Sequence, residues 1–334
     1  MDKIKVIIYG CGVMGRKISQ ALLNKEIFKI VGAVDINPEL VGKDLGEVLE
    51  IPEKLNIEIE QDADLLFSRV KANAVVLTTT SHLKDVFPQI TLCLKAGFNV
   101  ISTCEELSYP WKRHPDLARE LDNLAKERGV TVVGTGINPG YLMDTLPLIL
   151  TAPCLRVKSV RVKRLINSSR RRIPFQVKVG TGLTQEEFRE KIENESITGH
   201  VGLLESVYMI ADGLGWELDR ALECPPQPVI NEEEVETGLG RVEPGHVIGL
   251  TSVAHGQKGG KDIITLEFCA NAAMEEESDE IIIEGEPSIH QKIIGGVHGD
   301  IGTVAMTINT IPRAIEASSG LILMKDLSLP RAVL

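Results

Sequence analysis

The sequence has few aromatic residues, no closely paired cysteines and no long apolar segment, and each lack excludes a class of protein. Phe, Trp and Tyr together make up 4% of the 334 residues, too few for a surface that stacks single-stranded bases. None of the six cysteines belongs to a C-x-x-C pair, so we expect reduced thiols in a cytoplasmic protein. No apolar run reaches the roughly 18 residues of a membrane span. No signal-peptide pattern precedes the first strand-like residues, so we expect no membrane partner.

The charge balance and the absence of metal motifs narrow the function further. Lys and Arg number 36 against 47 Asp and Glu, which gives a net charge of −11 and disfavours a nucleic-acid partner. No H-E-x-x-H motif or other metal-ligand spacing is present, so we expect no metal. Hydrophobic residues, at 43%, suffice for a sizeable core, and the length suggests two domains of roughly 150 residues each.

Residues 1–140 alternate between short apolar runs and amphipathic stretches. This alternation predicts an α/β fold of the Rossmann type, with a doubly wound parallel sheet. The predicted strands are Lys5–Tyr9, Lys29–Val34, Ala74–Leu77, Val100–Ile101 and Val130–Val133. The predicted helices are Val13–Leu23, Lys84–Lys95 and Pro115–Arg128.

The pattern changes beyond about Asn138. It predicts a second, α+β domain with a mostly antiparallel sheet. The predicted strands are Arg156–Ile166, Val247–His255, Asp262–Ala270 and Ile281–Glu284, and the predicted helices are Gln185–Glu195, Val201–Leu214 and Ile301–Ala317. The acidic run Glu275–Glu280 is expected to be a solvated turn.

A glycine motif follows the first predicted strand and opens a helix. Gly10-Cys11-Gly12-Val13-Met14-Gly15 fits G-x-G-x-x-G, in which glycines permit a tight turn and let the backbone approach a pyrophosphate. Asp35 lies 20 residues further on, where a carboxylate can bind a ribose hydroxyl and repel a 2′-phosphate. This favours NAD as the cofactor, although Arg16 could pair with that phosphate and keeps NADP open.

Three more loops follow predicted strands, where ligands of open α/β sheets bind. Their candidate cofactor and substrate residues are Thr79, Thr80, Ser81, Thr103, Cys104 and Asn138. Glu105 and Glu106 are the candidates for a catalytic general base, and each could instead be a structural carboxylate. Cys104 could be a nucleophile, but two adjacent carboxylates would raise its pKa.

The second domain offers polar candidates for a substrate site. Arg164, Asn167 and the run Arg170-Arg171-Arg172 lie at the end of the long basic strand, and arginine can hold a carboxylate with two hydrogen bonds. His200 and His298 lie in glycine-rich segments before predicted helices. Either histidine could line a pocket, and each could equally be structural.

The nucleotide half resembles the N-terminal domain of dihydrodipicolinate reductase. The resemblance rests on 10–16, 78–81, 101–104 and 134–140, in order. The diacid-binding signature of that enzyme is absent, however. By analogy with it, the C-terminal helix packs back on the nucleotide domain, which would comprise residues 1–140 and about 300–334, with about 141–299 as the substrate-binding and oligomerisation domain.

The whole chain resembles the 2,4-diaminopentanoate dehydrogenases and related native amine dehydrogenases. The matching phrases lie at 101–110, 134–140, 180–184, 199–202 and 298–301. The resemblance implies NAD(P)-dependent oxidative deamination of an amine, in the family 2,4-diaminopentanoate to 2-amino-4-oxopentanoate plus ammonia. A glutamate then activates water, and we prefer Glu105 to Glu106 because it is nearer the strand end.

Further roles follow from this resemblance by position. Arg164 is the first candidate for the substrate carboxylate, and Asn138 or Asn167 for its ammonium group. We expect a homodimer through the second sheet, since symmetric dimers are common. Two alternatives remain, because the fold alone does not distinguish between these functions. The first is a dihydrodipicolinate reductase-like enzyme or another small alcohol or aldehyde dehydrogenase. The second is a non-catalytic protein that senses a nucleotide.

Overall fold

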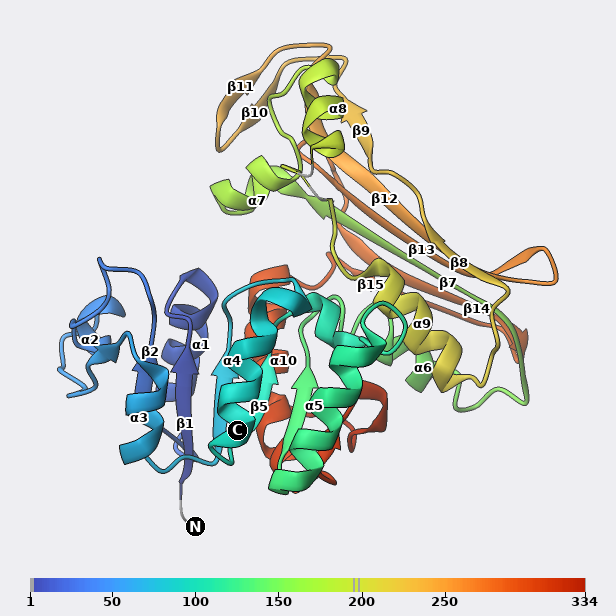
Figure 1. The fold of residues 1–334 in the computed structure, drawn as a ribbon. Helices are drawn as coiled ribbons and strands as arrows, with labels where there is room; N and C mark the ends of the chain where they lie inside the picture. The colour runs from blue at the N-terminus through green and yellow to red at the C-terminus, as the bar shows by residue number, and fades with distance from the viewer. Residues whose placement is uncertain (1–2, 195, 198, 334) are drawn as a thin grey trace. The chain divides into compact units, whose positions relative to one another are not determined.

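The computed structural model describes residues 3–194, 196–197 and 199–333. The chain divides into two compact units, and the first is built from two separate segments of the sequence. Unit 1 comprises Met1–Tyr141 and Gly299–Leu334, and unit 2 comprises Leu142–His298 (Figure 1). The chain therefore leaves unit 1 once and returns to it for its last segment.

Unit 1 contains a seven-stranded sheet in which all neighbouring strands pair in parallel. In spatial order the strands are β16 (Gly320–Leu321), β6 (Thr131–Gly134), β5 (Asn99–Ser102), β4 (Ala74–Leu77), β1 (Ile4–Tyr9), β2 (Phe28–Val34) and β3 (Ile59–Glu60). The predicted Rossmann-type sheet is confirmed. The strand order reverses between β1 and β4, and the carboxyl ends at such a switch point are where ligands bind.

Helices cover both faces of this sheet. They are α1 (Val13–Leu23), α2 (Leu45–Val48), α3 (Ala63–Arg69), α4 (Leu83–Lys95), α5 (Pro115–Arg128) and α10 (Gly299–Glu316), with the 3₁₀ turns η1 (Glu105–Ser108) and η3 (Met324–Asp326). Helices α4 and α5 pack together in front of the sheet in Figure 1, and α10 packs behind it against α1, β5 and β6. In the described part of the chain, no helix is long and apolar enough to cross a membrane.

Unit 2 is built on a second sheet that is mostly antiparallel, as predicted. Its order is β15 (Ile289–Ile294), β14 (Ser278–Glu286), β7 (Arg156–Asn167), β13 (Lys261–Asn271), β12 (Val247–Lys258) and β8 (Arg220–Glu223), with β9 (Gln227–Ile230) also paired to β12. Only β7 and β13 run parallel among these pairs. A small hairpin joins β10 (Val235–Thr237) to β11 (Gly240–Val242).

The helices of unit 2 are short except for one. They are α6 (Thr145–Leu150), α7 (Ile173–Lys178), α8 (Gln185–Glu193) and α9 (Leu203–Gly213), with the 3₁₀ turn η2 (Ser168–Arg170). Helix α9 packs on β12 and β13 through Leu203, Val207 and Ile210, all fully buried. The predicted helix end at Glu195 lies outside the described residues.

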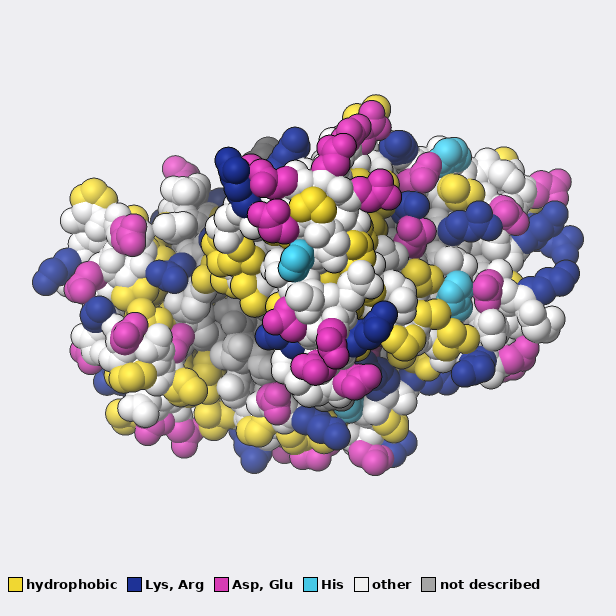
Figure 2. Space-filling model, turned by 90° about the horizontal axis from the view of Figure 1, so that it is seen from above, with side chains coloured by type: hydrophobic (Ala, Val, Ile, Leu, Met, Phe, Trp, Pro, Cys, Tyr) yellow, Lys and Arg dark blue, Asp and Glu magenta, His cyan; other side chains and the backbone are white. Residues whose placement is uncertain are grey.

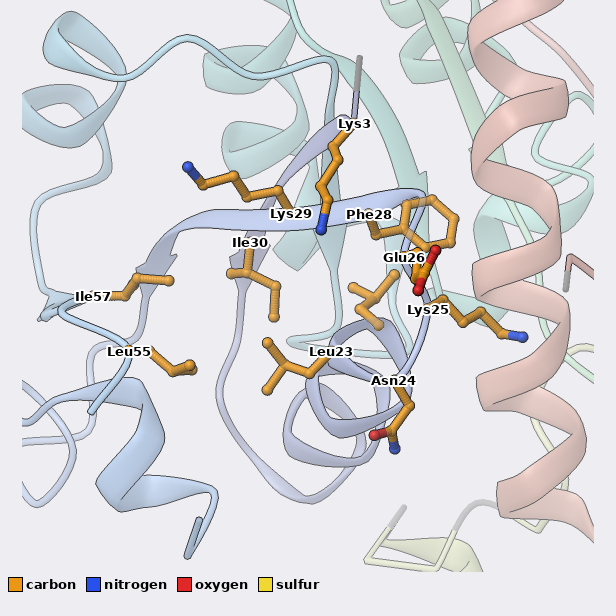
Figure 3. Close-up of a pocket in the computed structure, with 11 residues that line it drawn as sticks. Lys3, Leu23, Asn24, Lys25, Glu26, Phe28, Lys29, Ile30, Leu55 and Ile57 are labelled. Atoms are coloured by element: carbon orange, nitrogen blue, oxygen red, sulfur yellow. The ribbon is translucent and has the colours of Figure 1, made fainter. Parts of the chain in front are cut away.

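A shallow pocket lies at the amino ends of β1 and β2 (Figure 3). Leu23, Leu55 and Ile57 line it, and Lys3 and Lys29 lie along one side. Because dinucleotides bind beyond the carboxyl ends of the strands, this pocket is at the wrong end of the sheet for a cofactor. On the face shown in Figure 2, acidic side chains are interspersed with basic ones.

Candidate active site

The turn between β1 and α1 has the geometry of a pyrophosphate cradle. Gly10 has a φ of 98°, which favours glycine, and a Cβ at Gly15 would lie 1.8 Å from the Gly10 carbonyl oxygen. A Cβ at Gly12 would meet nothing within 4 Å, so this residue borders open space. No side chain caps the N-terminus of α1 among the described residues, which leaves its N–H groups to bind an anion. This turn fits a dinucleotide.

Asp35 is fixed beside that turn at the end of β2. Its Oδ2 accepts the N–H of Cys11 at 2.6 Å, and its Oδ1 accepts the N–H of Asn37 at 2.8 Å. The Cys11 thiol is buried, and burial, with the nearby Asp35 charge, raises its pKa to about 12. Cys11 therefore contributes its backbone N–H to this turn rather than a reactive sulfur. Arg16, in the first turn of α1, is half-buried.

The loop after β4 lies against the glycine turn and against the loop after β5. Thr78 Oγ1 donates to the Gly10 carbonyl at 2.8 Å. Thr79 is exposed and donates to Gln89 at 2.6 Å, whereas Thr80 and Ser81 are half-buried. Thr103 follows β5, and its N–H donates to Leu77 at the end of β4. The predicted cofactor residues of these three loops therefore meet at one edge of the sheet.

Cys104 is buried and has a structural contact. Its Sγ lies 3.1 Å from the Ser81 carbonyl oxygen, to which the thiol donates. Burial raises the pKa of this thiol well above its usual range, and the charges of Glu105 and Glu106 raise it further. A thiol that stays protonated is a poor nucleophile, so the structure argues against an aldehyde-oxidising cysteine.

Glu105 and Glu106 lie in the 3₁₀ turn η1 but have different surroundings. Glu105 is half-buried, and its carboxylate has no hydrogen-bond or ion-pair partner among the residues that the structure describes. The Glu106 side chain is 7% exposed and accepts the N–H of Leu83 at 2.7 Å. Residues in a 3₁₀ helix are about 120° apart, so the two side chains face different directions. Of these two side chains, only that of Glu105 lacks a partner within the described part of the chain.

The loop after β6 brings Asn138 to the same edge of the sheet. The peptide bond between Asn138 and Pro139 is cis, and the N–H of Ile137 donates to Thr303 Oγ1 of α10 at 3.4 Å. Gly140 has a φ of 120°, and a Cβ there would lie 2.6 Å from the Gly136 nitrogen. A side chain at Gly140 would therefore disturb the loop that carries Asn138. Thr303 did not emerge from the sequence, because its partner lies more than 160 residues away.

The expected substrate-binding role of Arg164 does not fit its surroundings. Its side chain is 2% exposed, lies 3.5 Å from Asp279 Oδ1 and donates to the Val297 carbonyl at 2.7 Å. Asp279 Oδ2 in turn accepts the Val297 N–H at 2.7 Å. The two side chains thus bind the carbonyl and the N–H of Val297, and the Asp279 carboxylate balances the charge of Arg164.

Asn167 and the acidic run are structural as well. The Asn167 amide accepts the N–H and hydroxyl of Ser169 and donates to the Met274 carbonyl at 2.7 Å, so it builds the turn η2. The expectation of a solvated turn at Glu275–Glu280 is wrong in part. Glu277 forms a largely buried ion pair with Arg171 at 2.7 Å, and Asp279 is buried against Arg164.

The two predicted histidines of unit 2 lie in different settings. The His200 ring stacks on Phe268, with centroids 4.4 Å apart and planes at 16°. Burial lowers the pKa of His200 to about 3, with smaller contributions from the charges of Lys178 and Arg164, so its imidazole is neutral at pH 7. His298 is half-buried and directly follows Val297. The hydrogen bonds of Arg164 and Asp279 to Val297 therefore fix the backbone immediately before His298.

Comparison with known proteins places this arrangement in a family. Residues 141–334 match the model of the 2,4-diaminopentanoate dehydrogenase C-terminal domain, and residues 4–105 match the dihydrodipicolinate reductase N-terminus. A 2,4-diaminopentanoate dehydrogenase from Acetoanaerobium sticklandii is 35% identical over 100% of this chain and 96% of its own. The chain belongs to the 2,4-diaminopentanoate dehydrogenase family. It is therefore an oxidoreductase, and the Rossmann-like unit of this family points to a nicotinamide cofactor.

Two further relatives of the family agree along nearly their whole length. An amine dehydrogenase from Streptomyces virginiae is 22% identical over 99% of this chain and 98% of its own. The structure of an amine dehydrogenase from Mycobacterium smegmatis superposes with a TM-score of 0.86 at 26% identity, covering 99% of this chain and 97% of that one. Both units of the 2,4-diaminopentanoate dehydrogenase fold are thus present here.

Proposed function

We propose that this protein is an NAD-dependent 2,4-diaminopentanoate dehydrogenase that produces 2-amino-4-oxopentanoate and ammonia. The observation that carries the proposal is the 35% identity to such an enzyme over the full chain. It is supported by an unoccupied carboxylate, that of Glu105, at the strand ends that form the candidate cofactor site. In the balanced reaction, the amine, the oxidised cofactor and one water are consumed. The products are the ketone, ammonia, the reduced cofactor and one proton.

The proposed cofactor contacts come from the first two βα loops. The N–H groups at the start of α1, from Gly12 to Gly15, would hold the pyrophosphate, and Asp35 would accept from the adenosine ribose. When bound, the nicotinamide supplies the acceptor for the hydride of the amine-bearing carbon. Both Asp35 oxygens already accept a backbone N–H, so the carboxylate is held in place beside the turn, where it would repel a 2′-phosphate. This supports NAD over NADP.

The proposed base is Glu105. Loss of hydride from the amine-bearing carbon leaves an iminium, whose positive charge a nearby carboxylate stabilises. Glu105 then takes a proton from the water that attacks this carbon, and returns a proton as ammonia leaves. Glu106 cannot share this role in its present contacts, because its carboxylate is committed to Leu83 and His114.

The remaining substrate contacts are proposed by position. Asn138 in unit 1, and His200 and His298 in unit 2, remain our candidates for hydrogen bonds to the substrate. We do not assign the substrate carboxylate to Arg164 or its ammonium group to Asn167, because Arg164 is buried and ion-paired with Asp279, and the Asn167 amide builds the turn η2. Residues that bind the carboxylate must then come from elsewhere in the chain.

We further propose a homodimer through the second sheet. The strands β7, β12 and β13 of this sheet are 11 to 12 residues long, so the sheet is broad. One of its faces carries half-buried and exposed side chains, among them Arg161, Lys163 and Glu267. A broad sheet face of this kind is a surface that a second copy can cover. Sedimentation equilibrium tests this, and a single species at the monomer mass would contradict it.

The test of the proposed activity follows both products. The chain is incubated with 2,4-diaminopentanoate and NAD, and in parallel with NADP, while reduced nicotinamide and ammonia are measured. We expect equal amounts of both products, with faster turnover on NAD. Glu105→Gln should reduce kcat by about 100-fold or more while the Kd of the cofactor stays the same, since removal of a general base costs 10²–10⁴-fold. Absence of turnover in a protein that binds the cofactor would refute the proposal that 2,4-diaminopentanoate is the substrate.

A further inference from the structure

The Glu106 carboxylate, itself largely buried, is the centre of a cluster that joins three segments of unit 1. Its Oε2 accepts the Leu83 N–H at 2.7 Å and lies 3.0 Å from His114 Nε2. Its Oε1 lies 3.4 Å from His82 Nδ1 and 3.8 Å from Arg113 Nη1. His114 is itself 12% exposed. The loop after β4, the turn η1 and the residues before α5 therefore share one carboxylate as their common partner.

Backbone contacts confine the same turn on two further sides. The N–H of Glu106 and the thiol of Cys104 both bind the Ser81 carbonyl, at 3.2 Å and 3.1 Å. On the β6 side, a Cβ at Gly134 would lie 2.6 Å from the Leu107 carbonyl carbon, so the turn is in close contact with this strand. Turn η1 thus has little room to move while the Glu106 contacts hold.

The charges of the cluster are complementary. Burial opposes ionisation of Glu106, yet the hydrogen bonds from Leu83 and His82 and the charges of His114 and Arg113 outweigh it and keep the pKa of Glu106 below its usual range. An ionised carboxylate only accepts hydrogen bonds, so His114 must donate its Nε2–H in either protonation state. The cluster is therefore held together by hydrogen bonds to an acceptor carboxylate and by the attraction of Arg113 to it.

We propose that Glu106 is a positioning residue that holds the turn carrying the base Glu105. This inference rests on the proposed function of Glu105. The two residues are neighbours in one 3₁₀ turn, so fixing the direction of Glu106 fixes Glu105 at about 120° from it. A base must stand within hydrogen-bond reach of its proton, and a misplacement of about 1 Å can cost about 100-fold in rate.

The experiment compares Glu106→Ala, Glu106→Gln, His114→Ala and the double variant Glu106→Ala/His114→Ala. Rates are expressed per cofactor-binding site, so that unfolded protein does not count. We expect Glu106→Ala to lower kcat by about tenfold or more, with the amine KM and the cofactor Kd within about threefold. Glu106→Gln should be intermediate, since its amide oxygen can still accept from Leu83. The double variant should be little slower than Glu106→Ala, because both act through one cluster.

A matched control separates positioning from general stability. Asp122, in α5, accepts the Leu321 N–H at 3.0 Å and anchors β16 without touching η1. Asp122→Asn should lower the melting temperature but leave kcat per site unchanged. Hydrogen exchange of the Leu83 amide provides a readout independent of activity, and should be faster in Glu106→Ala only.

Each result decides the proposal. Unchanged kcat per site in Glu106→Ala, or unchanged exchange of the Leu83 amide, overturns it while the proposed function stands. Independent, multiplicative effects of Glu106→Ala and His114→Ala also overturn it. If Glu105→Gln keeps turnover and Glu106→Gln abolishes it, Glu106 is itself the base, and both the positioning role and the proposed role of Glu105 are lost.

Discussion

The neutral state of His200 predicts a specific loss of stability in acid. Its ring is stacked on Phe268, and burial together with the charges of Lys178 and Arg164 lowers its pKa from 6.5 to about 3. In the unfolded chain the same imidazole takes up a proton below about pH 6.5. Between these two values only the unfolded state is protonated, so the free energy of unfolding falls as the pH decreases from 6.5 toward 3.

The size of the effect follows from the two pKa values of His200. Stability changes by at most about 1.4 kcal/mol per pH unit for one proton. From pH 7 to pH 5, the free energy of unfolding should fall by about 2 kcal/mol through this histidine alone, because most of the change occurs below pH 6.5.

Urea unfolding at pH 7 and pH 5 measures this loss for the parent and for His200→Phe. Phenylalanine keeps an aromatic ring on Phe268 but cannot take up a proton. The other titrating groups cancel in the difference between the two proteins, and any hydrogen bond lost in the variant changes its stability equally at both pH values. We expect the parent to lose about 2 kcal/mol more than the variant.

A matched control uses His290, whose side chain is 61% exposed on β15. If His290→Phe reduced the pH dependence as much as His200→Phe, burial would not be the cause. Equal losses in the parent and in His200→Phe would refute the reasoning outright, since the folded protein would then protonate His200 as readily as the unfolded chain does.

Three further predictions concern other parts of the structure. Asp279→Ala should lower the free energy of unfolding, measured in urea melts, by about 3–5 kcal/mol, because it leaves the buried charge of Arg164 unpaired. The double variant Arg164→Met/Asp279→Leu should recover most of this loss, and an equal loss in both variants would contradict the prediction. Gly15→Ala should weaken cofactor binding by more than about tenfold in a fluorescence titration, since its Cβ would lie 1.8 Å from the Gly10 carbonyl oxygen. Asp35→Ser should raise the Kd of NAD by about tenfold or more and lower that of NADP, and an unchanged NAD to NADP ratio would argue against its proposed role.

The sequence predicted those parts of the fold that local patterns determine. The strands β1, β2 and β4 are continuous apolar runs, and α1, α4 and α5 have helical apolar spacing, so they were found within one or two residues. The strands β3 and β16 were missed because each has only two residues, too few for a pattern, and both are edge strands. Their pairing depends on partners elsewhere in the sheet.

The site was predicted less completely because its charges pair across long distances in the chain. Arg164 and Asn167 were expected to bind substrate, but their partners, Asp279 and Met274, come from more than 100 residues away. The distinction between Glu105 and Glu106 depends on nearer residues, Leu83 and His114, whose side of the turn the sequence pattern does not reveal. One signal in the sequence could have pointed to a bound carboxylate: His82 and His114 flank the pair Glu105 and Glu106 on both sides.

The division of unit 1 into two segments has a consequence for synthesis of the protein. Strand β16 pairs with β6, and α10 covers β5 and β6, so the sheet that carries the glycine turn is finished only by residues after His298. Unit 2 is continuous and leaves the ribosome earlier than these residues. During translation β6 is therefore an exposed edge beside an uncovered apolar face, a state prone to aggregation. The segment of unit 1 that precedes unit 2 is thus completed only after unit 2 has been made.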